Sequence, residues 1–323
     1  MSGPGARCHT VGADLAGRRL DAALAEVLEA LGEPVPGLRG RRRLLDSIGL
    51  LPATPQAEIP AGEESPRRLA RQGCWQAFFK PAGWHSVSLA GGGGRSLEAA
   101  IPSLWEVGAE PAAWALLQRL DARTSGIVCA AVAPDAAALE RAVQDFRQAE
   151  AEGRCRKGYL ALLDGRLEGE ACVRRALDMS RRRAVRLLEG DSADPARWTH
   201  FRPLHHWQGE ACASLVRELG ARFSLPPAAR PRSLTLAACT IRRGARHQIR
   251  AHAAALGHAL WLDGLYASSL PQSPRDGQGA FFLHHGALRL PWARWTLPPD
   301  WFAEGEIAAI CRKWLENDFM DTV

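Results

Sequence analysis

The chain has 323 residues, of which 46% are apolar and 24% are charged. This length predicts about two domains with a real hydrophobic core, and the composition excludes disordered, collagen-like and coiled-coil proteins. The longest purely apolar run, residues 127–133, is far shorter than the roughly 18 residues that a membrane-spanning helix needs. The first residues lack the charged start and apolar stretch of a signal peptide, so we expect a cytoplasmic protein with no membrane partner.

Positive charge is unevenly distributed along the chain. The net charge is +6, and no acidic residue lies between Glu218 and Asp263, a segment that contains seven arginines. A second arginine cluster lies within residues 174–186. Guanidinium groups suit phosphate oxygens, so both clusters favour a polyanionic partner, although a solvated arginine-rich face has the same composition.

The first 66 residues predict a small, mostly helical domain. Residues 14–31 carry leucines at spacings of three and four, which predicts an amphipathic helix, and a second short helix follows the basic run at 39–43. Residues 51–66 hold four prolines, which is typical of irregular chain. We therefore predict two domains, residues 1–66 and residues 67–323.

The second domain alternates strands with few helices. Helical spacing of apolar residues predicts helices at 134–149, 245–256 and about 303–317. Several strands between sparse helices predict an α+β fold with a mixed, mainly antiparallel sheet flanked by helices. Short apolar runs predict those strands at 75–79, 116–118, 126–132, 157–163, 171–176, 199–204, 211–217 and 234–241.

A polar loop between two of these strands contains Asp121, flanked by Arg119 and Arg123. An aspartate in such a loop can be a nucleophile, a metal ligand or a turn-capping residue, and the loop alone does not distinguish them. The eight cysteines and the histidines at 247, 252 and 258 have no metal-binding spacing, so we expect no metal ion and read the cysteines as small buried residues.

Five short motifs follow one another in the second domain. They are KPAG at residues 80–83, RLD at 119–121, KGY at 157–159, HQIR at 247–250 and FLH at 282–284. In residue type, order and spacing they resemble the RluA-type pseudouridine synthases over about residues 75–295. The resemblance implies the pseudouridine synthase fold and an isomerase that converts uridine to pseudouridine in structured RNA, with no cofactor. The chain offers no Walker loop or dinucleotide fingerprint, in agreement with a reaction that needs neither ATP nor electrons.

The resemblance also implies three catalytic residues. Asp121 would act on the sugar as the nucleophile, either by attack at C1′ or through a glycal, while the target base is flipped out of its stack. Arg250 would pair with Asp121 and stabilise its ionised form. Tyr159 would stack on the base and help the proton on C5 to leave.

Further residues are expected to bind the RNA. Arg119 would hold the RNA around the vacated base, and Leu283 would form an apolar wall. Lys80 and Lys157 would contact phosphates or stabilise loops. His247 and Gln248 complete the predicted substrate-binding set, whereas Asp263 and Tyr266, in a segment similar to the family's G-D-x-x-Y, are expected to be structural.

Several positions depart from the family pattern. Gln118 replaces a histidine, Ala245 and Arg246 replace Arg-Thr, and Leu262 replaces a glycine. A catalytically inactive RNA-binding protein of the same fold is therefore the alternative. A hydrolase that uses Asp121 is less favoured, because retaining hydrolysis needs a second carboxyl group about 5 Å away and no motif supplies one.

The N-terminal residues suggest the class of RNA. Residues 17–24 and 59–63 resemble, in degenerate form, the alpha-L RNA-binding module of ribosomal protein S-four type. Such modules often accompany synthases that act on rRNA, so the partner is expected to be rRNA or tRNA, with rRNA slightly favoured. We expect a monomer by default.

Overall fold

The computed structural model describes most of the predicted second domain. The described residues are 64–89, 94–106, 111–180, 184–223, 225, 230–267, 281–302 and 304–321. The predicted N-terminal module, with its two helices, lies outside them apart from residues 64–66. The boundary at residue 67 and the RNA-binding role of the module therefore stay predictions.

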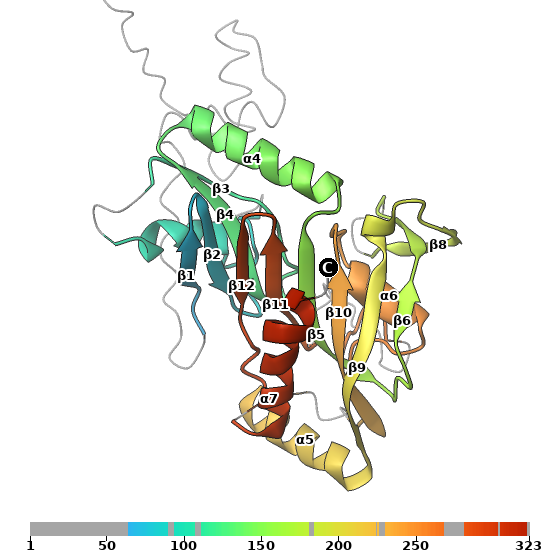
Figure 1. Ribbon diagram of the computed structural model, residues 1–323. Helices are drawn as coiled ribbons and strands as arrows, with labels where there is room; N and C mark the ends of the chain where they lie inside the picture. The colour runs from blue at the N-terminus through green and yellow to red at the C-terminus, as the bar shows by residue number, and fades with distance from the viewer. Residues whose placement is uncertain are drawn as a thin grey trace, which may run out of the picture. The chain divides into compact units, whose positions relative to one another are not determined.

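One large sheet organises the described residues (Figure 1). Its strand order is β1-β2-β4-β11-β5-β10-β9-β6, with β12 beside β11 and β3 beside β4. The pair β4–β11 is parallel and the other pairs are antiparallel, so the predicted mixed, mainly antiparallel sheet is confirmed. The strands are β1 Arg67–Gln72, β2 Trp75–Lys80, β3 Ala113–Leu116, β4 Ser125–Ala133, β5 Arg156–Asp164, β6 Ala171–Val173, β9 Thr199–Gln208, β10 Ser233–Ile241, β11 Leu283–Leu290 and β12 Ala293–Thr296.

A separate two-stranded hairpin and short helices complete the fold. The hairpin consists of β7 Arg175–Asp178 and β8 Arg186–Asp191. The α-helices are α3 Leu97–Ala100, α4 Ala136–Ala151, α5 Gly209–Arg222, α6 Gln248–Ala255, α7 Glu306–Lys313 and α8 Phe319–Asp321. Single turns of other helix types lie at Ile101–Leu104, Pro195–Arg197 and Trp314–Asp318. None of the helices in these described segments is long and apolar enough to cross a membrane.

Helices cover both faces of the sheet. Alternate residues of a strand point to opposite faces, so β4 supplies Val128 to one core cluster and Ile127 to another. The first face packs against α3 and α6, and the opposite face packs against α4, α5 and the C-terminal helices. Figure 1 shows α4 along β3 and β4, and α7 in front of β5 and β11. Because both faces are covered, β4 is buried along its whole length and reads as a continuous apolar run.

The structure corrects one predicted strand. Residues 211–217, expected as a strand, belong to helix α5. Cys212, Leu215 and Leu219 are its buried residues, and their spacing of three and four is helical rather than alternating. Strands β1, β8, β11 and β12 are not among the strands expected from the sequence. The strand expected at 171–176 is divided between β6 and β7, and β3 ends at Leu116, the first residue of the strand expected at 116–118.

The parallel contact between β4 and β11 fixes the start of β4. Ser125 and Gly126 pair with His284 and His285, and the Ser125 hydroxyl lies 2.9 Å from Nδ1 of His284. Gly126 has φ +118°, and a Cβ added there would lie 2.3 Å from the carbonyl oxygen of His285. Only glycine fits this approach, which holds the loop before β4 against β11.

We predict that Gly126→Ala lowers the free energy of unfolding by about 3 kcal/mol or more, because strain and a backbone clash coincide. Urea unfolding followed by circular dichroism measures the change. Gly169→Ala is the matched control, since a Cβ at Gly169 meets no atom within 4 Å. Equal stability of the two variants would contradict the close packing of β4 on β11.

Candidate active site

Asp121 lies in the loop between β3 and β4, and this loop is fastened to the segment after β2. The hydroxyl oxygen of Ser86 accepts a hydrogen bond from the Leu120 N–H at 2.8 Å and donates to the Leu120 carbonyl oxygen at 3.0 Å. The N–H of Gly83 donates to the Ala122 carbonyl oxygen at 2.8 Å. These bonds on both sides of Asp121 hold its backbone in place.

Lys80 holds the same loop through hydrogen bonds from its buried side chain. Its ammonium group is fully buried and donates to the carbonyl oxygens of Pro81, Trp84 and Ala122 at 2.9, 2.6 and 3.1 Å. Burial lowers the pKa of Lys80 to about 7, an effect that the charge of Asp121 opposes. Lys80 therefore stabilises the loop and is too deeply buried to contact RNA phosphates, which corrects its place in the predicted substrate-binding set.

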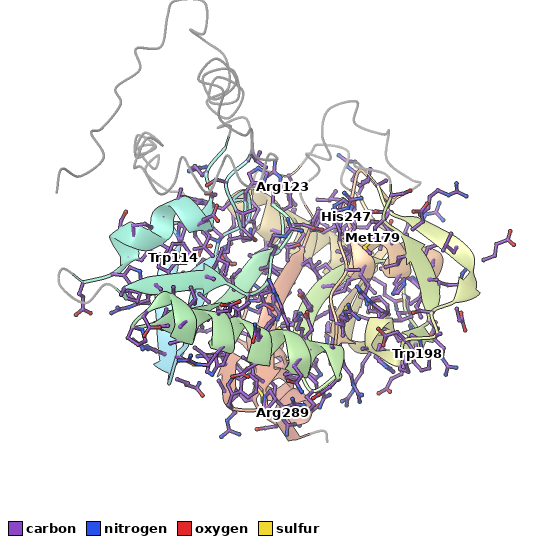
Figure 2. The ribbon with its side chains drawn as sticks, turned by 90° about the horizontal axis from the view of Figure 1, so that it is seen from above. Trp114, Arg123, Met179, Trp198, His247 and Arg289 are labelled. Atoms are coloured by element: carbon purple, nitrogen blue, oxygen red, sulfur yellow. The ribbon has the colours of Figure 1, made fainter. Side chains whose placement is uncertain are left out.

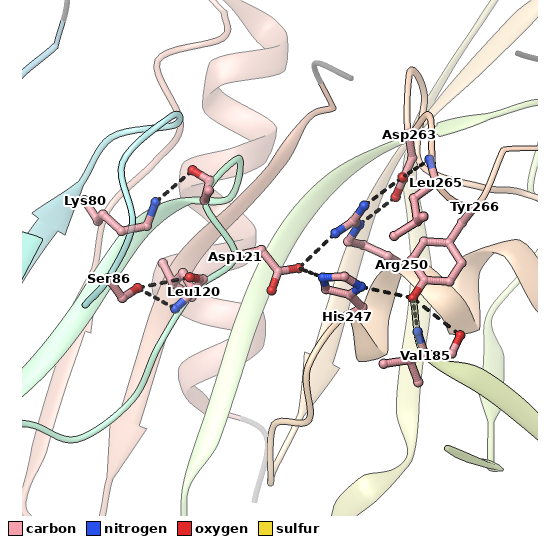
Figure 3. A network of polar contacts seen from close by, with 11 residues as sticks. Lys80, Ser86, Leu120, Asp121, Val185, His247, Arg250, Asp263, Leu265 and Tyr266 are labelled. Carbon is pink, nitrogen blue, oxygen red and sulfur yellow. Dashed lines mark hydrogen bonds and ion pairs between the residues drawn. The ribbon is translucent and has the colours of Figure 1, made fainter. Parts of the chain in front are cut away.

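A buried guanidinium joins two carboxylates (Figure 3). Nε and Nη2 of Arg250 donate to the two carboxylate oxygens of Asp263 at 2.7 and 2.8 Å, and Nη1 donates to Oδ2 of Asp121 at 3.2 Å. Burial opposes the charge of Arg250, but the hydrogen bonds and charges of Asp263 and Asp121 outweigh it and raise the pKa of this arginine. The predicted pair of Asp121 and Arg250 is present, and Asp263 anchors it.

His247 is the second group beside Asp121. Its Nε2 lies 3.8 Å from Oδ2 of Asp121, and its Nδ1 lies 3.0 Å from the hydroxyl oxygen of Tyr266. Burial lowers the pKa of His247 although Asp121 opposes this, so the ring is neutral at physiological pH. Among the described residues, no hydrogen bond reaches the other oxygen of Asp121, Oδ1.

Tyr159 lies on β5 and stacks on His285 of β11. Their ring centres are 4.5 Å apart and the planes differ by 22°, because the strand register places the two residues opposite each other. Burial, together with the negative charge of Asp121, raises the pKa of Tyr159, so its hydroxyl keeps its proton at neutral pH. His285 is also neutral, since burial lowers its pKa to about 3.

Lys157 points to the same face of β5 as Tyr159, because the two are two residues apart in a strand. Its buried ammonium group pairs with the carboxylate of Glu150 at the end of α4. Lys157 is thus held by a carboxylate of this chain, and the pair forms one wall of a cavity.

These residues surround one cavity of about 420 Å³, a size typical of small-molecule sites. Its wall includes Asp121, Tyr159, Lys157, Leu283, Arg119, His247, Gln248 and Arg250. The structure therefore brings eight of the nine predicted site residues together, and Lys80 alone lies behind the wall. The described residues contain no cluster of three or more histidine, cysteine or acidic side chains that could hold a metal ion.

Some side chains of the cavity wall are hydrogen-bonded within the protein, and others are exposed to solvent. Gln248 uses its amide within the protein, donating to Arg197 O at 2.7 Å and accepting from Ala245 N at 3.0 Å. Arg119 is exposed on the wall. Figure 2 shows His247 near Met179 of the β7–β8 hairpin, and a side-chain nitrogen of Arg246 reaches the Met179 carbonyl at 3.4 Å. The arginine-rich hairpin thus borders the site.

Two polar residues of the site were missed in the sequence. Glu150 is half-buried near the end of α4, and nothing in its spacing marks it as a partner of Lys157. His285 follows the recognised FLH motif, and only the β5–β11 register shows that it supports Tyr159. Asp263 was expected to be structural, which its anchoring of Arg250 bears out.

The family described as RNA pseudouridylate synthase matches residues 80–255, more than half of the chain. A solved structure of human RNA pseudouridylate synthase domain containing 1 is 18% identical, with a TM-score of 0.53 over 77% of this chain and 90% of that one. Human RNA pseudouridylate synthase domain containing 4 is 14% identical, with a TM-score of 0.48 over 77% and 92%. No curated protein matches the sequence.

We predict that Arg250→Met lowers the free energy of unfolding by about 3–5 kcal/mol, because it leaves the fully buried Asp263 without its cation. The double variant with Asp263→Asn should recover most of this loss, giving a large coupling energy in a double-mutant cycle measured by urea unfolding. Arg217→Met is the control at an exposed ion pair and should change stability by less than about 1 kcal/mol. Additive losses at Arg250 and Asp263 would contradict the buried pair.

The pKa of Lys80 predicts how stability depends on pH. The folded state holds Lys80 with a pKa of about 7, below its ordinary value of 10.5. Between these values the unfolded chain binds the extra proton, so the wild type gains stability as pH rises. Relative to Lys80→Met, the gain should approach about 1.4 kcal/mol per pH unit in that window. Lys313→Met controls for loss of an exposed lysine, and parallel curves for wild type and Lys80→Met would contradict the assignment.

Proposed function

The chain belongs to the RNA pseudouridylate synthase family, as its motifs predicted, and on this premise we propose that Asp121 is the nucleophile with which it isomerises uridine in structured RNA. The fold is that of the pseudouridine synthases, which confirms the fold class expected from the resemblance. The chain is thus an RNA pseudouridine synthase, an isomerase. The identity of its nucleophile and of its RNA is what we propose here.

The main support for the proposal is that only one of the two carboxylate oxygens of Asp121 is hydrogen-bonded by the described residues. Oδ2 receives the guanidinium of Arg250, whereas Oδ1 has no hydrogen bond from any described residue. A nucleophilic carboxylate needs this combination, since one oxygen fixes its charge and orientation and the other remains for the sugar. Asp121 lines the cavity, where a flipped nucleotide would meet it.

Tyr159 and Leu283 are suited to hold the base. Both are buried in the cavity wall, and the stacking of Tyr159 on His285 fixes the orientation of its ring. Because the pKa of Tyr159 is raised, its neutral hydroxyl suits stacking and hydrogen bonding better than service as a standing base. This assigns the aromatic ring to positioning the uracil for reattachment.

The reaction gains and loses no atoms overall. The bond between C1′ and N1 breaks, the bond between C1′ and C5 forms, the proton on C5 leaves, and N1 takes up a proton. The cavity supplies the carboxylate of Asp121 on the same wall as Tyr159 and Leu283, so the sugar and the base can be held there together. Neither of the routes considered for Asp121 requires a second carboxylate beside the sugar.

The RNA partner is assigned from charge. The exposed Arg119, Arg246 on the cavity wall and the neighbouring β7–β8 hairpin bring positive charge to the rim of the site, which suits a phosphate backbone. Phosphate contacts position the RNA, and the flipped base supplies specificity. We favour rRNA over tRNA because residues 17–24 and 59–63 resemble a module that often accompanies rRNA-directed synthases.

Release of tritium from RNA labelled at uridine C5 tests the proposal. We expect wild type to release tritium from total rRNA or total tRNA, tested separately, and Asp121→Asn to lose at least about a thousandfold in rate. Asn keeps the size of the side chain but removes the negative charge. Binding of each RNA pool is measured in parallel by filter retention.

Each outcome has a distinct meaning. Release that persists in Asp121→Asn would remove Asp121 as the nucleophile, and the pool that responds decides between rRNA and tRNA. RNA binding without release by wild type on either pool would favour the inactive RNA-binding alternative. Asp135→Asn, at the exposed N-cap of α4, is the control for loss of a carboxylate outside the cavity.

A further inference from the structure

A chain of polar contacts leads from Val185, directly before β8 in the β7–β8 hairpin, to Asp121 (Figure 3). The backbone N–H of Val185 donates to the hydroxyl oxygen of Tyr266 at 2.8 Å. That oxygen lies 3.0 Å from Nδ1 of His247, and Nε2 of His247 lies 3.8 Å from Oδ2 of Asp121. Tyr266 therefore meets the ring of His247 on the side away from the carboxylate.

The geometry indicates where the protons lie. The Tyr266 oxygen accepts from Val185 N, so its own proton is free to be donated. Two acceptors are near, His247 Nδ1 at 3.0 Å and the Val185 carbonyl at 3.5 Å, and the shorter contact is the better hydrogen bond. If Nδ1 accepts, the single proton of a neutral imidazole must be on Nε2.

The backbone conformation of His247 places its ring between Tyr266 and Asp121. His247 has φ +54°, a left-handed conformation that is unfavourable for a residue with a Cβ. Such strain persists only where the surroundings hold it, and it is concentrated at functional sites. The charged groups that act on the ring are Asp121, Arg250, Arg246 and Asp263, and a neutral N–H donor fits beside this mixture better than a second cation.

We propose that Tyr266 is a positioning residue that holds His247 in the tautomer with Nε2–H, so that His247 and Arg250 both direct donors at Oδ2 of Asp121 and leave Oδ1 for the sugar. The opposite tautomer would place a lone pair of Nε2 against the carboxylate. The contact at 3.8 Å is longer than a hydrogen bond, and we expect it to shorten when RNA binds, because catalytic contacts are often long in the absence of substrate. This inference rests on the proposed role of Asp121.

The first test reads the tautomer directly and needs no activity. Nitrogen-15 NMR of ring-labelled histidine distinguishes protonated from bare ring nitrogens, and His247→Gln identifies the signals of His247 by their loss. We expect Nε2–H in the wild type and a mixture of tautomers in Tyr266→Phe. A wild-type ring protonated on Nδ1 overturns the proposal, whatever the variants do.

The second test separates positioning from binding. With C5-labelled rRNA or tRNA, whichever pool the wild type acts on, Tyr266→Phe should lower kcat about 10- to 100-fold and leave KM almost unchanged. Phenylalanine keeps the ring that packs under the Arg250 guanidinium, and thermal unfolding checks the fold. An unchanged kcat, or a change in KM alone, overturns the proposal.

A matched pair at position 247 provides the rescue. His247→Gln keeps a donor nitrogen near the place of Nε2, whereas His247→Asn keeps one near the place of Nδ1. We expect glutamine to retain at least about tenfold more activity than asparagine, and Tyr266→Phe to cost little more in the glutamine background. Equal loss in both variants overturns the proposal. If wild type itself releases no tritium, the proposed function fails, while the NMR test still decides the tautomer.

Discussion

The site depends on one buried cation, the guanidinium of Arg250. A carboxylate such as Asp263, fully removed from water, is stable only beside a cation with matching donors, and the planar fork of arginine supplies two parallel hydrogen bonds to it. The third direction of the fork reaches Asp121. Asp263 therefore fixes the direction of the guanidinium, and the guanidinium fixes the direction of the Asp121 carboxylate. A lysine could not meet both carboxylates in this way, because its ammonium group has no planar fork.

The sheet also helps to position Asp121, through the pairing of β4 with β11. Asp121 precedes β4, and β4 is held in register with β11 where Gly126 approaches the His285 backbone. The same β11 residue pairs with Tyr159 across the β5 register, so His285 contacts both the start of β4 and the ring of Tyr159. Packing in the core thus sets the relative positions of Asp121 and Tyr159, which are 38 residues apart. Lys80 completes the arrangement with three hydrogen bonds to loop carbonyls.

Site residues that belong to short sequence motifs could be predicted from the sequence, whereas residues that depend on packing could not. Asp121 and Arg250 are 129 residues apart and were paired correctly through a family resemblance, since no periodicity relates them. The strands β4, β5 and β10 of the sheet centre were predicted from their apolar runs, whereas β11, which lies between β4 and β5, was not predicted. Residues 211–217 were predicted as a strand and belong to α5, because a short apolar run does not distinguish a strand from a buried helix. Glu150 and His285 could not be identified, because their partners are set by the packing of α4 and by strand register. The motif at 80–83 left two roles open for Lys80, phosphate contact and loop stabilisation, because a motif gives residue type without burial.

Backbone strain shows how the departure at Leu262 is tolerated. Among the described residues, His247 and Leu262 are the two residues other than glycine with positive φ, and they lie on either side of Arg250. The family glycine expected at 262 would adopt φ +69° without cost, whereas leucine pays about 1–2 kcal/mol there. Its side chain, however, is buried in the core cluster with Trp261 and Phe282, which contributes roughly 2 kcal/mol. The two effects nearly cancel, so the turn that presents Asp263 to Arg250 keeps its geometry. The packed core therefore holds the unfavourable backbone conformations of His247 and Leu262, on either side of Arg250. Because Arg250 is held in this way, the carboxylate of Asp121 is oriented without bound RNA.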